Sequence, residues 1–391
     1  MRVKLKDIFD LQMGKTPSRS NLEYWNTTDY KWISIADLTK TSKYIFETKE
    51  YLSKSAIKDS GIKVIPANTV VMSFKLSIGK TAITKEDMYS NEAIMAFKDK
   101  HVINIIPEYI FYLFKYKNWE ECSNKAVMGK TLNKATLSEI EVEICSIEKQ
   151  RQIVNILDKI MSAVDGRKQE LQLLDELIKA QFVEMFGNPV TNEKGWKQRQ
   201  LGEITTKIGS GATPKGGKEA YQEEGITLIR SMNVHNGLFE YKELAHISEE
   251  QAEKLDNVTI EENDVLLNIT GASVARSCVV PSKILPARVN QHVCIIRCNQ
   301  CIVPEFLNKL LIDDNYQRLL WSIAEAGATR EAITKQQVES LQIIMPPIEL
   351  QEQFADFVHQ VDKSKFDTMT FAPIYDIINL YLHTHFYQGR R

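Results

Sequence analysis

Three Gly-Lys-Thr triplets are the residues whose types most directly suggest chemistry, because the same triplet ends the phosphate-binding loop of many nucleotide-binding enzymes. The triplets begin at Gly14, Gly79 and Gly129. That loop also requires a glycine five residues before the glycine of the triplet, where backbone amides surround the phosphates. The triplets do not predict ATP binding, because none has that glycine. The residues at the three positions are Phe9, Phe74 and Asn124.

The cysteines and histidines do not form a metal-ligand pattern. Cys294, Cys298 and Cys301 have the spacing C-x3-C-x2-C, but a structural zinc site needs four ligands, usually in two pairs. No second pair lies nearby, and Cys294 belongs to an apolar run, so the cysteines are interpreted as thiols in a reducing compartment. His383 and His385 have no cysteine or carboxylate at ligand spacing. We therefore predict no metal site. The other cysteines are Cys122, Cys145 and Cys278.

Residues for catalysis are not apparent either. A methyltransferase needs a glycine-rich cofactor loop after a strand, and an adenine methylase also needs an Asn/Asp-Pro-Pro-aromatic segment. The nearest match is Asn188-Pro189-Val190, which we interpret as the end of a helix. No Ser-His-Asp or Cys-His assignment stands out among the seven histidines. We predict no catalytic residue and no cofactor on this chain.

The sequence is instead organised as a duplication, which is the observation that decides its interpretation. Seven blocks recur in the same order at an offset that drifts only from about 195 to 201 residues, too long for a solenoid repeat. Each copy is therefore a domain. The paired blocks begin at Leu5 and Leu201, Gly14 and Gly211, Ile33 and Ile229, Ile65 and Ile260, Pro107 and Pro304, Gly129 and Gly327, and Ile147 and Ile348.

Each copy mixes strand and helix signals, which predicts an α+β domain of about 145 residues. Short runs rich in valine and isoleucine, at 70–72, 265–267 and 295–296, indicate strands. The segments 107–117 and 304–312 indicate helices, because each opens with proline in its first turn. The Gly-x-Thr-Pro segments indicate turns.

Between the copies, residues 147–186 predict one long helix of about 60 Å. The segment contains no proline, and Gly187-Asn188-Pro189 ends it. An apolar stripe with alternating steps of four and three favours a coiled coil, although Arg167 and Gln181 interrupt it. The alternative is that the stripe packs only on its own domains. The predicted seam comprises Ile153, Leu157, Ile160, Val164, Leu171, Leu174, Ile178 and Met185.

Composition and charge bound the possible function classes. The chain is 43% hydrophobic and 26% charged, which is typical of globular domains. No apolar run reaches the roughly 20 residues of a membrane span, and the start lacks a secretion signal, so the cytoplasm is the expected location. Residues 1–146 carry 22 basic and 18 acidic side chains, against 17 and 20 for residues 188–345. Only the first half carries a net positive charge, and that small excess favours nucleic-acid binding only weakly.

The doubled order of these blocks, with a helix between the copies, resembles the specificity subunit of Type I restriction–modification enzymes. The resemblance covers about residues 1–366 and is carried by motifs that are individually weak. They are the Leu-x-x-Ile openings, the Gly-x-Thr-Pro turns, the segments Trp32 to Leu38 and Ser77 to Lys80, Asn91 and Asn290-Gln291, the Pro-Glu-Tyr/Phe starts, the Gly-x-Thr turns, and Pro346 to Gln353.

The resemblance implies a subunit that binds double-stranded DNA and is not itself an enzyme. Each target-recognition domain would read one half of a split, asymmetric site, with an antiparallel coiled coil of two helices as the spacer. Two modification subunits carrying S-adenosylmethionine would methylate adenines, and restriction subunits using ATP and Mg would cut DNA. The implied divisions are target-recognition domains at 1–146 and 188–345, a spacer helix at 147–187, and a second helix region at 346–391.

The C-terminal region departs from the family pattern. The stretch 167–187 has no counterpart after Phe366, and Pro373 would break a continuing helix. We therefore expect the second helix to be shortened or altered. A smaller departure is Cys145-Ser146, where the family usually has two prolines.

Under this resemblance, DNA contacts are expected from polar side chains in and beside the turns. Lysine would hold phosphates, while arginine, asparagine and glutamine can bind base edges in two places. In the first copy the candidates are Lys15, Thr16, Ser18, Arg19, Lys75, Lys80, Lys130 and Thr131. In the second copy they are Thr213, Lys215, Lys218, Arg230, Asn268, Arg276, Gln291, His292, Thr329 and Arg330.

Three alternatives stay open at this point. The chain could be a self-contained site-specific nuclease or methylase, which the missing cofactor loops disfavour. It could be a scaffold whose helix organises protein partners without reading DNA. It could also be a variant or inactive specificity allele whose altered end prevents assembly.

Overall fold

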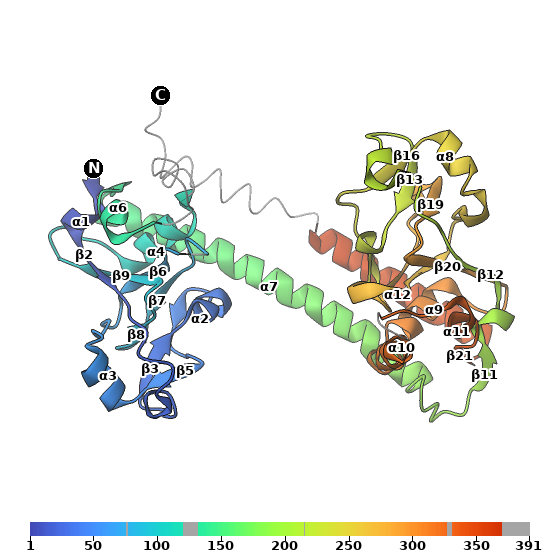
Figure 1. The fold of residues 1–391 in the computed structure, drawn as a ribbon, viewed down its shortest axis with the longest axis horizontal. Helices are drawn as coiled ribbons and strands as arrows, with labels where there is room; N and C mark the ends of the chain where they lie inside the picture. Colours follow the sequence, from blue (N-terminus) through green and yellow to red (C-terminus); the bar gives the residue numbers. More distant parts are fainter. Residues whose placement is uncertain (76, 120–131, 215, 327–330, 370–391) are drawn as a thin grey trace. The chain divides into compact units, whose positions relative to one another are not determined.

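The computed structural model describes residues 1–75, 77–119, 132–214, 216–326 and 331–369. The chain divides into two compact units, one containing Met1–Arg167 and the other Lys168–Thr370. The division lies inside α7 (Ile147–Phe186), which Figure 1 shows as one unbroken helix. The predicted long helix is therefore confirmed, and each unit contains part of it.

The first unit is built around a five-stranded sheet in the order β2-β9-β6-β7-β4. β9 lies between β2 and β6 and is antiparallel to both. The side chains of β2, β6 and β9 that point to one face form a core with α4 and the first turns of α7. The bounds are β2 Phe9–Met13, β4 Tyr44–Ile45, β6 Val70–Ser73, β7 Thr81–Thr84, β9 Ile94–Asp99 and α4 Pro107–Lys115.

Two smaller sheets complete the first unit. β3 pairs antiparallel with β5 and parallel with β8, and the chain ends of the unit are joined by an antiparallel pair of β1 with β10. The bounds are β1 Arg2–Lys4, β3 Tyr30–Ile33, β5 Glu50–Leu52, β8 Tyr89–Ser90 and β10 Glu141–Glu143. The short helices are α1 Leu5–Ile8, α2 Ile35–Lys40, α3 Lys54–Ser60 and α6 Lys134–Ser138.

The second unit repeats this arrangement. Its main sheet has the order β12-β20-β17-β18, β13 pairs antiparallel with β16 and parallel with β19, and β11 pairs antiparallel with β21. The bounds are β11 Lys197–Gln200, β12 Thr205–Ser210, β13 Ile226–Ile229, β14 Val234–His235, β15 Leu238–Phe239, β16 Ala245–Ile247, β17 Val265–Asn268, β18 Ser277–Val279, β19 Ala287–Val289, β20 Val293–Cys298 and β21 Gln342–Met345. The helices are α8 Glu249–Glu253, α9 Pro304–Leu311, α10 Asp314–Glu325, α11 Lys335–Glu339 and α12 Ile348–Met369.

A pair of buried glutamines shows how closely the two copies correspond. Gln150, in the first turn of α7, accepts a hydrogen bond from the Ile106 amide at 2.9 Å, just before α4. Gln351, in the first turn of α12, accepts one from the Val303 amide at 3.0 Å, just before α9. Both glutamines are fully buried, and each also donates to a carbonyl two residues before its own helix begins. The duplication predicted from the sequence is thus present in the tertiary contacts.

The apolar stripe of α7 packs into the core of both units. Ile153 and Leu157 are buried in the first core, and Ile160 packs against it. In the second core Ile178 is buried, and Leu174 and Met185 pack against it. The two remaining seam residues, Val164 and Leu171, are half-buried. Much of the stripe therefore packs on the two units themselves, which is the second of the two alternatives given for it above.

The last part of α7 also pairs with α12 inside the second unit. The Phe354 ring of α12 lies 5.5 Å from the ring of Phe182, and the Lys365 amine lies 2.7 Å from the Asp175 carboxylate. From the first contact to the second, the residue number rises along α12 and falls along α7, so the two helices are antiparallel, as can be followed in Figure 1. α12 is described over Ile348–Met369, and because the residues that follow lie outside the described part of the chain, the shortened second helix stays a prediction. Pro373 and the tail beyond it lie outside the described residues.

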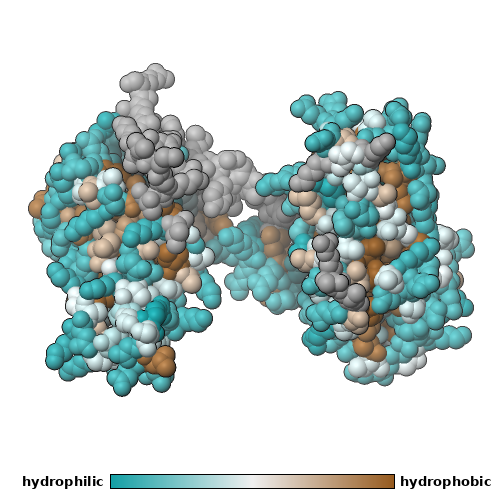
Figure 2. Space-filling model, in the orientation of Figure 1, coloured by the Kyte–Doolittle hydropathy of each residue, from teal (hydrophilic) through white to brown (hydrophobic). Residues whose placement is uncertain are grey.

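In the view of Figure 2, hydrophilic residues predominate among the described residues, and apolar ones form separate groups. Among the helices of the described part of the chain, none combines the length and apolar character needed to cross a membrane.

Candidate nucleic-acid interface

The Gly-x-Thr-Pro turn of the first unit is held tightly against the segment that joins β8 to β9. The Gly14 amide donates to the Ile94 carbonyl at 3.1 Å, and the Lys15 amide donates to the Ser90 carbonyl at 2.8 Å. A Cβ atom built on Gly14 would lie 2.2 Å from the Asn91 carbonyl oxygen. Only glycine allows this approach of two backbones.

The corresponding turn of the second unit lies as closely against the equivalent segment, through a different amide pairing. The Gly211 amide donates to the Asn290 carbonyl at 3.2 Å, and a Cβ atom on Gly211 would lie 1.7 Å from the Val289 carbonyl oxygen. Asn91 and Asn290 occupy equivalent places, because their amides donate to the equivalent carbonyls of Ile33 and Ile229 at 3.1 and 3.0 Å. Both units therefore place a Gly-x-Thr-Pro turn at the same point of the same framework.

Replacing Gly211 with alanine is expected to lower the free energy of unfolding by about 1–3 kcal/mol, because two backbone segments must separate to admit the methyl group. Gly209→Ala is the matched control, since it lies two residues away in β12 and its Cβ would meet no atom within 4 Å. Urea-induced unfolding of the full chain measures both. Equal stability of the two variants would contradict the close approach.

The threonine of each turn fixes the side chain that follows the equivalent asparagine. The Thr16 hydroxyl donates to the Glu92 carboxylate, and the Thr213 hydroxyl donates to the amide oxygen of Gln291. Glu92 and Gln291 are both exposed. The hydrogen bond from Thr16 holds the pKa of the Glu92 carboxyl below its usual range, and the positive charges of Lys75 and Arg19 act in the same direction. Glu92 is therefore ionised at neutral pH.

Sequence analysis proposed Gln291 but missed Glu92. The signal that would have found it is the register of the repeat, because Asn91-Glu92 aligns with Asn290-Gln291.

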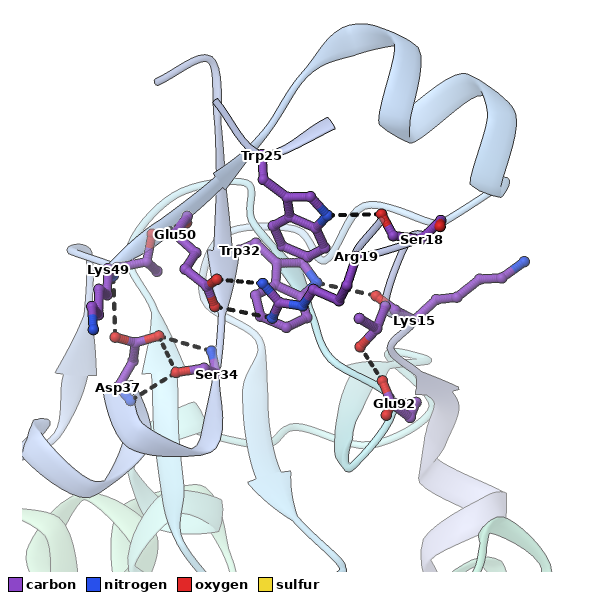
Figure 3. A network of polar contacts seen from close by, with 12 residues as sticks. Lys15, Ser18, Arg19, Trp25, Trp32, Ser34, Asp37, Lys49, Glu50 and Glu92 are labelled. Carbon is purple, nitrogen blue, oxygen red and sulfur yellow. Dashed lines mark hydrogen bonds and ion pairs between the residues drawn. The ribbon is translucent and has the colours of Figure 1, made fainter. Parts of the chain in front are cut away.

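Arg19 is already occupied by its own unit. Its guanidinium forms an ion pair with Glu50, with Nη2 donating to Oε2 at 3.1 Å, and its central carbon lies 3.7 Å from the centre of the Trp25 ring. Figure 3 shows the guanidinium between the Glu50 carboxylate and the rings of Trp25 and Trp32. The two indole N–H groups donate to the carbonyls of Ser18 and Lys15, both at 3.0 Å. Arg19 is therefore held beside the turn, and its exposed guanidinium keeps N–H donors beyond the two that Glu50 uses.

Of the other candidates in the first unit, Lys15 and Ser18 belong to this turn, and Lys75 and Lys80 lie between β6 and β7. Lys15 is exposed and its amine donates to the Ser60 carbonyl, and in Figure 3 its side chain points away from the tryptophans. The Ser18 hydroxyl lies 2.8 Å from that of Ser20. Lys75 lies over the Phe74 ring, and the Lys80 amine donates to the Thr39 hydroxyl. Lys130 and Thr131 lie outside the described residues.

In the second unit a chain of polar contacts continues from Gln291. Its amide nitrogen lies 3.2 Å from Nε2 of His292, and Nδ1 of His292 lies 2.5 Å from the Thr270 hydroxyl. With Thr213 this makes four side chains in sequence across the surface. Gln291 and His292 were both predicted as candidate contacts, and the structure brings them together with Thr213.

Asn268 is a correction to the predicted interface. Its side chain is fully buried, and its amide nitrogen donates to the Ser231 carbonyl at 2.8 Å. It therefore secures the loop after β13 from inside, and the prediction that it contacts DNA is wrong for this structure. The polar side chain at the end of β17 was taken for a surface residue, whereas all four residues of that strand are buried.

Arg230 and Arg276 take different positions. The Arg230 guanidinium donates to the Glu243 carbonyl and lies 5.4 Å from the centre of the Tyr221 ring. Arg276 is half-buried beside the short 3-10 helix Gly271–Ser273. Lys215, Thr329 and Arg330 lie outside the described residues, as does the side chain of Lys218.

Three of the four cysteines of the second unit are held as thiols in this fold, whereas Cys301 is exposed. Burial raises the pKa of the Cys278, Cys294 and Cys298 thiols to about 12. Each is therefore protonated at neutral pH, and the thiolate is the form that reacts or binds a metal. Cys122 lies outside the described residues.

Comparison with known proteins gives a consistent result for both halves of the chain. A family model described as the Type I restriction modification DNA specificity domain matches residues 1–176 and 193–373. The chain is 25% identical over 378 residues to the Type I restriction enzyme MjaIX specificity subunit of Methanocaldococcus jannaschii, covering 91% of this chain and 85% of that protein.

Two solved structures share the fold. The S subunit of a Type-I restriction-modification system from M. genitalium has a TM-score of 0.57 and 13% sequence identity, over 99% of this chain and 96% of its own. A chain from a structure of the type I R-M system, described for its complex assembly and conformational transition, has a TM-score of 0.58 and 17% identity, over 98% and 97%. Because the family model matches both copies of a repeat that the strand order and the glycine-held turns also reveal, this chain belongs to the family of Type I restriction modification DNA specificity domains.

Proposed function

We propose that this chain is the DNA-recognition subunit of a Type I restriction–modification complex and that each unit reads one half of a split, asymmetric site. One observation carries the proposal. Two units with the same backbone framework present different polar side chains at the same surface point, Glu92 in one and Gln291 in the other. Equal folds with unequal side chains suit two half-sites of unequal sequence, because sequence is recognised by hydrogen bonds to base edges.

The spacer between the half-sites would be set by α7. A continuous helix rises about 1.5 Å per residue, so the number of residues in it sets its length in ångströms. The interval between two recognition elements on DNA is likewise a geometric quantity. The pairing of α7 with α12 supports a stiff element, since the aromatic contacts and the Lys365–Asp175 ion pair join the two helices.

Catalysis would belong to partner subunits. Methyltransferase subunits carrying S-adenosylmethionine would methylate adenines in the recognised site, and restriction subunits using ATP and Mg would cleave. Two modification subunits for each specificity subunit is the stoichiometry expected of the resemblance. The relatives are named as specificity subunits, which agrees with a chain that directs chemistry performed by others.

The proposal is tested by sequencing methylated adenines in cells that co-express the full chain with the methyltransferase subunits of its own system. The expected result is a two-part motif. Exchanging residues 188–345 for those of a relative should change one half of the motif and leave the other half and the spacer unchanged. A single uninterrupted motif, or a change in both halves, would contradict separate readers.

A second arm of the same experiment inserts one heptad between Val164 and Leu171. Seven residues add about 10 Å of helix and nearly two full turns, so the apolar stripe keeps its direction. The spacer should grow by about three base pairs, given 3.4 Å per step, while both half-sites stay the same. An unchanged spacer would show that α7 does not set the interval.

A further inference from the structure

Four pairs of equivalent positions surround the glycine-held turns. The registers of β6 with β9 and of β17 with β20 align Val70 with Val265 and Phe97 with Ile296. The amides of Phe74 and Ile269 then donate to the equivalent carbonyls of residues 93 and 292, at 2.9 and 3.0 Å. These pairings give one surface site in each unit. The paired residues are Thr16 and Thr213, Lys75 and Thr270, Glu92 and Gln291, and Ala93 and His292.

The first site presents a carboxylate near two cations, of which Arg19 also forms an ion pair with Glu50. Glu92 is exposed, accepts a hydrogen bond from Thr16, and is ionised at neutral pH because that bond and the charges of Lys75 and Arg19 lower its pKa. A carboxylate can only accept hydrogen bonds. Beside DNA an isolated carboxylate would be repelled by phosphates, and Lys75 and Arg19 reduce that repulsion at this point.

The second site presents an amide. The Gln291 oxygen accepts from Thr213, and its nitrogen faces His292, which in turn contacts Thr270. An amide nitrogen carries two hydrogens and the oxygen has two lone pairs, so Gln291 can make these contacts and still offer one donor and one acceptor. Holding the side chain in place reduces the conformational entropy lost when it binds a partner.

We propose that Glu92 and Gln291 are the equivalent base-contacting residues of the two units, with Glu92 accepting a hydrogen bond from the exocyclic amino group of cytosine and Gln291 binding the N6 and N7 edge of adenine. The chemistry of each side chain sets the assignment, since carboxylates accept from cytosine N4 and glutamine pairs with adenine in two places. This inference rests on the proposed function and names the residues through which the two half-sites differ.

The competing explanation is that both side chains only secure the turn. Glu92→Gln separates the two explanations, because the amide oxygen can still accept the Thr16 hydrogen bond while the acceptor-only group becomes a donor and acceptor. A purely structural role predicts no change in the recognised sequence. A base contact predicts a change at one position.

The experiment uses the full chain with its methyltransferase subunits and selects bound duplexes from a library of randomised double-stranded DNA. Glu92→Gln should shift the preference at one position of the first half-site from cytosine toward adenine by about tenfold or more. The second half-site should not change. Gln291→Glu should do the reverse in the second half-site only. Glu47→Gln, an exposed acid of the first unit, is the matched control and should leave both half-sites unchanged.

Thr16→Val is a second variant, which tests the same contact without placing an amide at position 92. It removes the hydroxyl that orients Glu92, so discrimination at the same position should weaken without a change in the preferred base. If Glu92→Gln and Gln291→Glu both retain the wild-type motif with unchanged preferences, the assignment is overturned while a split motif of the wild type still supports the proposed function. If the wild-type complex selects no motif, the proposed function fails, and this assignment fails with it.

Discussion

Replacing Phe354 with alanine is expected to lower the free energy of unfolding of the second unit by about 3–5 kcal/mol. The ring is fully buried and packs edge-on against Phe182 at 5.5 Å and Phe186 at 5.4 Å. These contacts join α12 to the last turns of α7, and Phe186 continues them to Phe306 of α9 at 4.8 Å. The substitution removes a large buried side chain and leaves a cavity among aromatic rings that cannot all move together.

Urea-induced unfolding of the full chain and hydrogen exchange of the α12 amides measure this effect. The control is Val183→Ala, because Val183 lies on α7 between Phe182 and Phe186 in sequence but is 51% exposed. It should change stability by no more than about 0.5 kcal/mol. Normal protection of the α12 amides in Phe354→Ala would show that the aromatic contacts do not hold the helix pair.

Replacing Arg297 with methionine is expected to lower the free energy of unfolding by about 3–5 kcal/mol, because it leaves a buried carboxylate without its cation. Arg297 donates to both oxygens of Asp264, from Nε at 2.8 Å and from Nη2 at 2.9 Å, and Asp264 is fully buried. The hydrogen bonds and charge of Asp264 raise the pKa of Arg297 above its ordinary value. A two-point pairing of this kind fixes the start of β17 against β20.

The first unit supplies a matched control at the equivalent position. Lys98 of β9 corresponds to Arg297, but its partner Asp10 is 61% exposed and the two charges are 3.2 Å apart. Lys98→Met should therefore change stability by at most about 1 kcal/mol. Thermal unfolding of the two variants compares them directly. If the double variant Arg297→Met with Asp264→Leu is as unstable as Arg297→Met alone, the unpaired carboxylate is not the cause.

The elements of the fold followed from the sequence wherever local pattern and long-range packing agreed. The apolar runs at 70–72 and 265–267 are β6 and β17, and the prolines at 107 and 304 begin α4 and α9. These segments carry strong local signals, which the tertiary contacts reinforce. The packing partner of the α7 stripe could not be predicted from the sequence, because the same heptad pattern suits a partner helix and the core of an attached domain equally well.

The candidate site was predicted less completely, and the errors have a common cause. Asn268 lies one residue from a surface loop in sequence, yet it is fully buried. Arg19 looked available, yet Glu50 and two tryptophans engage it. Glu92 was overlooked because its role depends on Thr16, which lies 76 residues away in the chain. A residue type tells which bonds a side chain can make, whereas only folding decides which partner it meets.

By itself the sequence determined the duplication, the α+β class and the long helix, because these depend on residues that the backbone requires at fixed places. Gly14 and Gly211 admit a close approach of two chains, and Gln150 and Gln351 satisfy the amide before a helix. The tertiary structure alone decided which polar side chains share one surface point. Hydrogen bonds reach only about 3 Å, so Glu92 and Gln291 acquire their partners only when distant turns and strand ends are brought together.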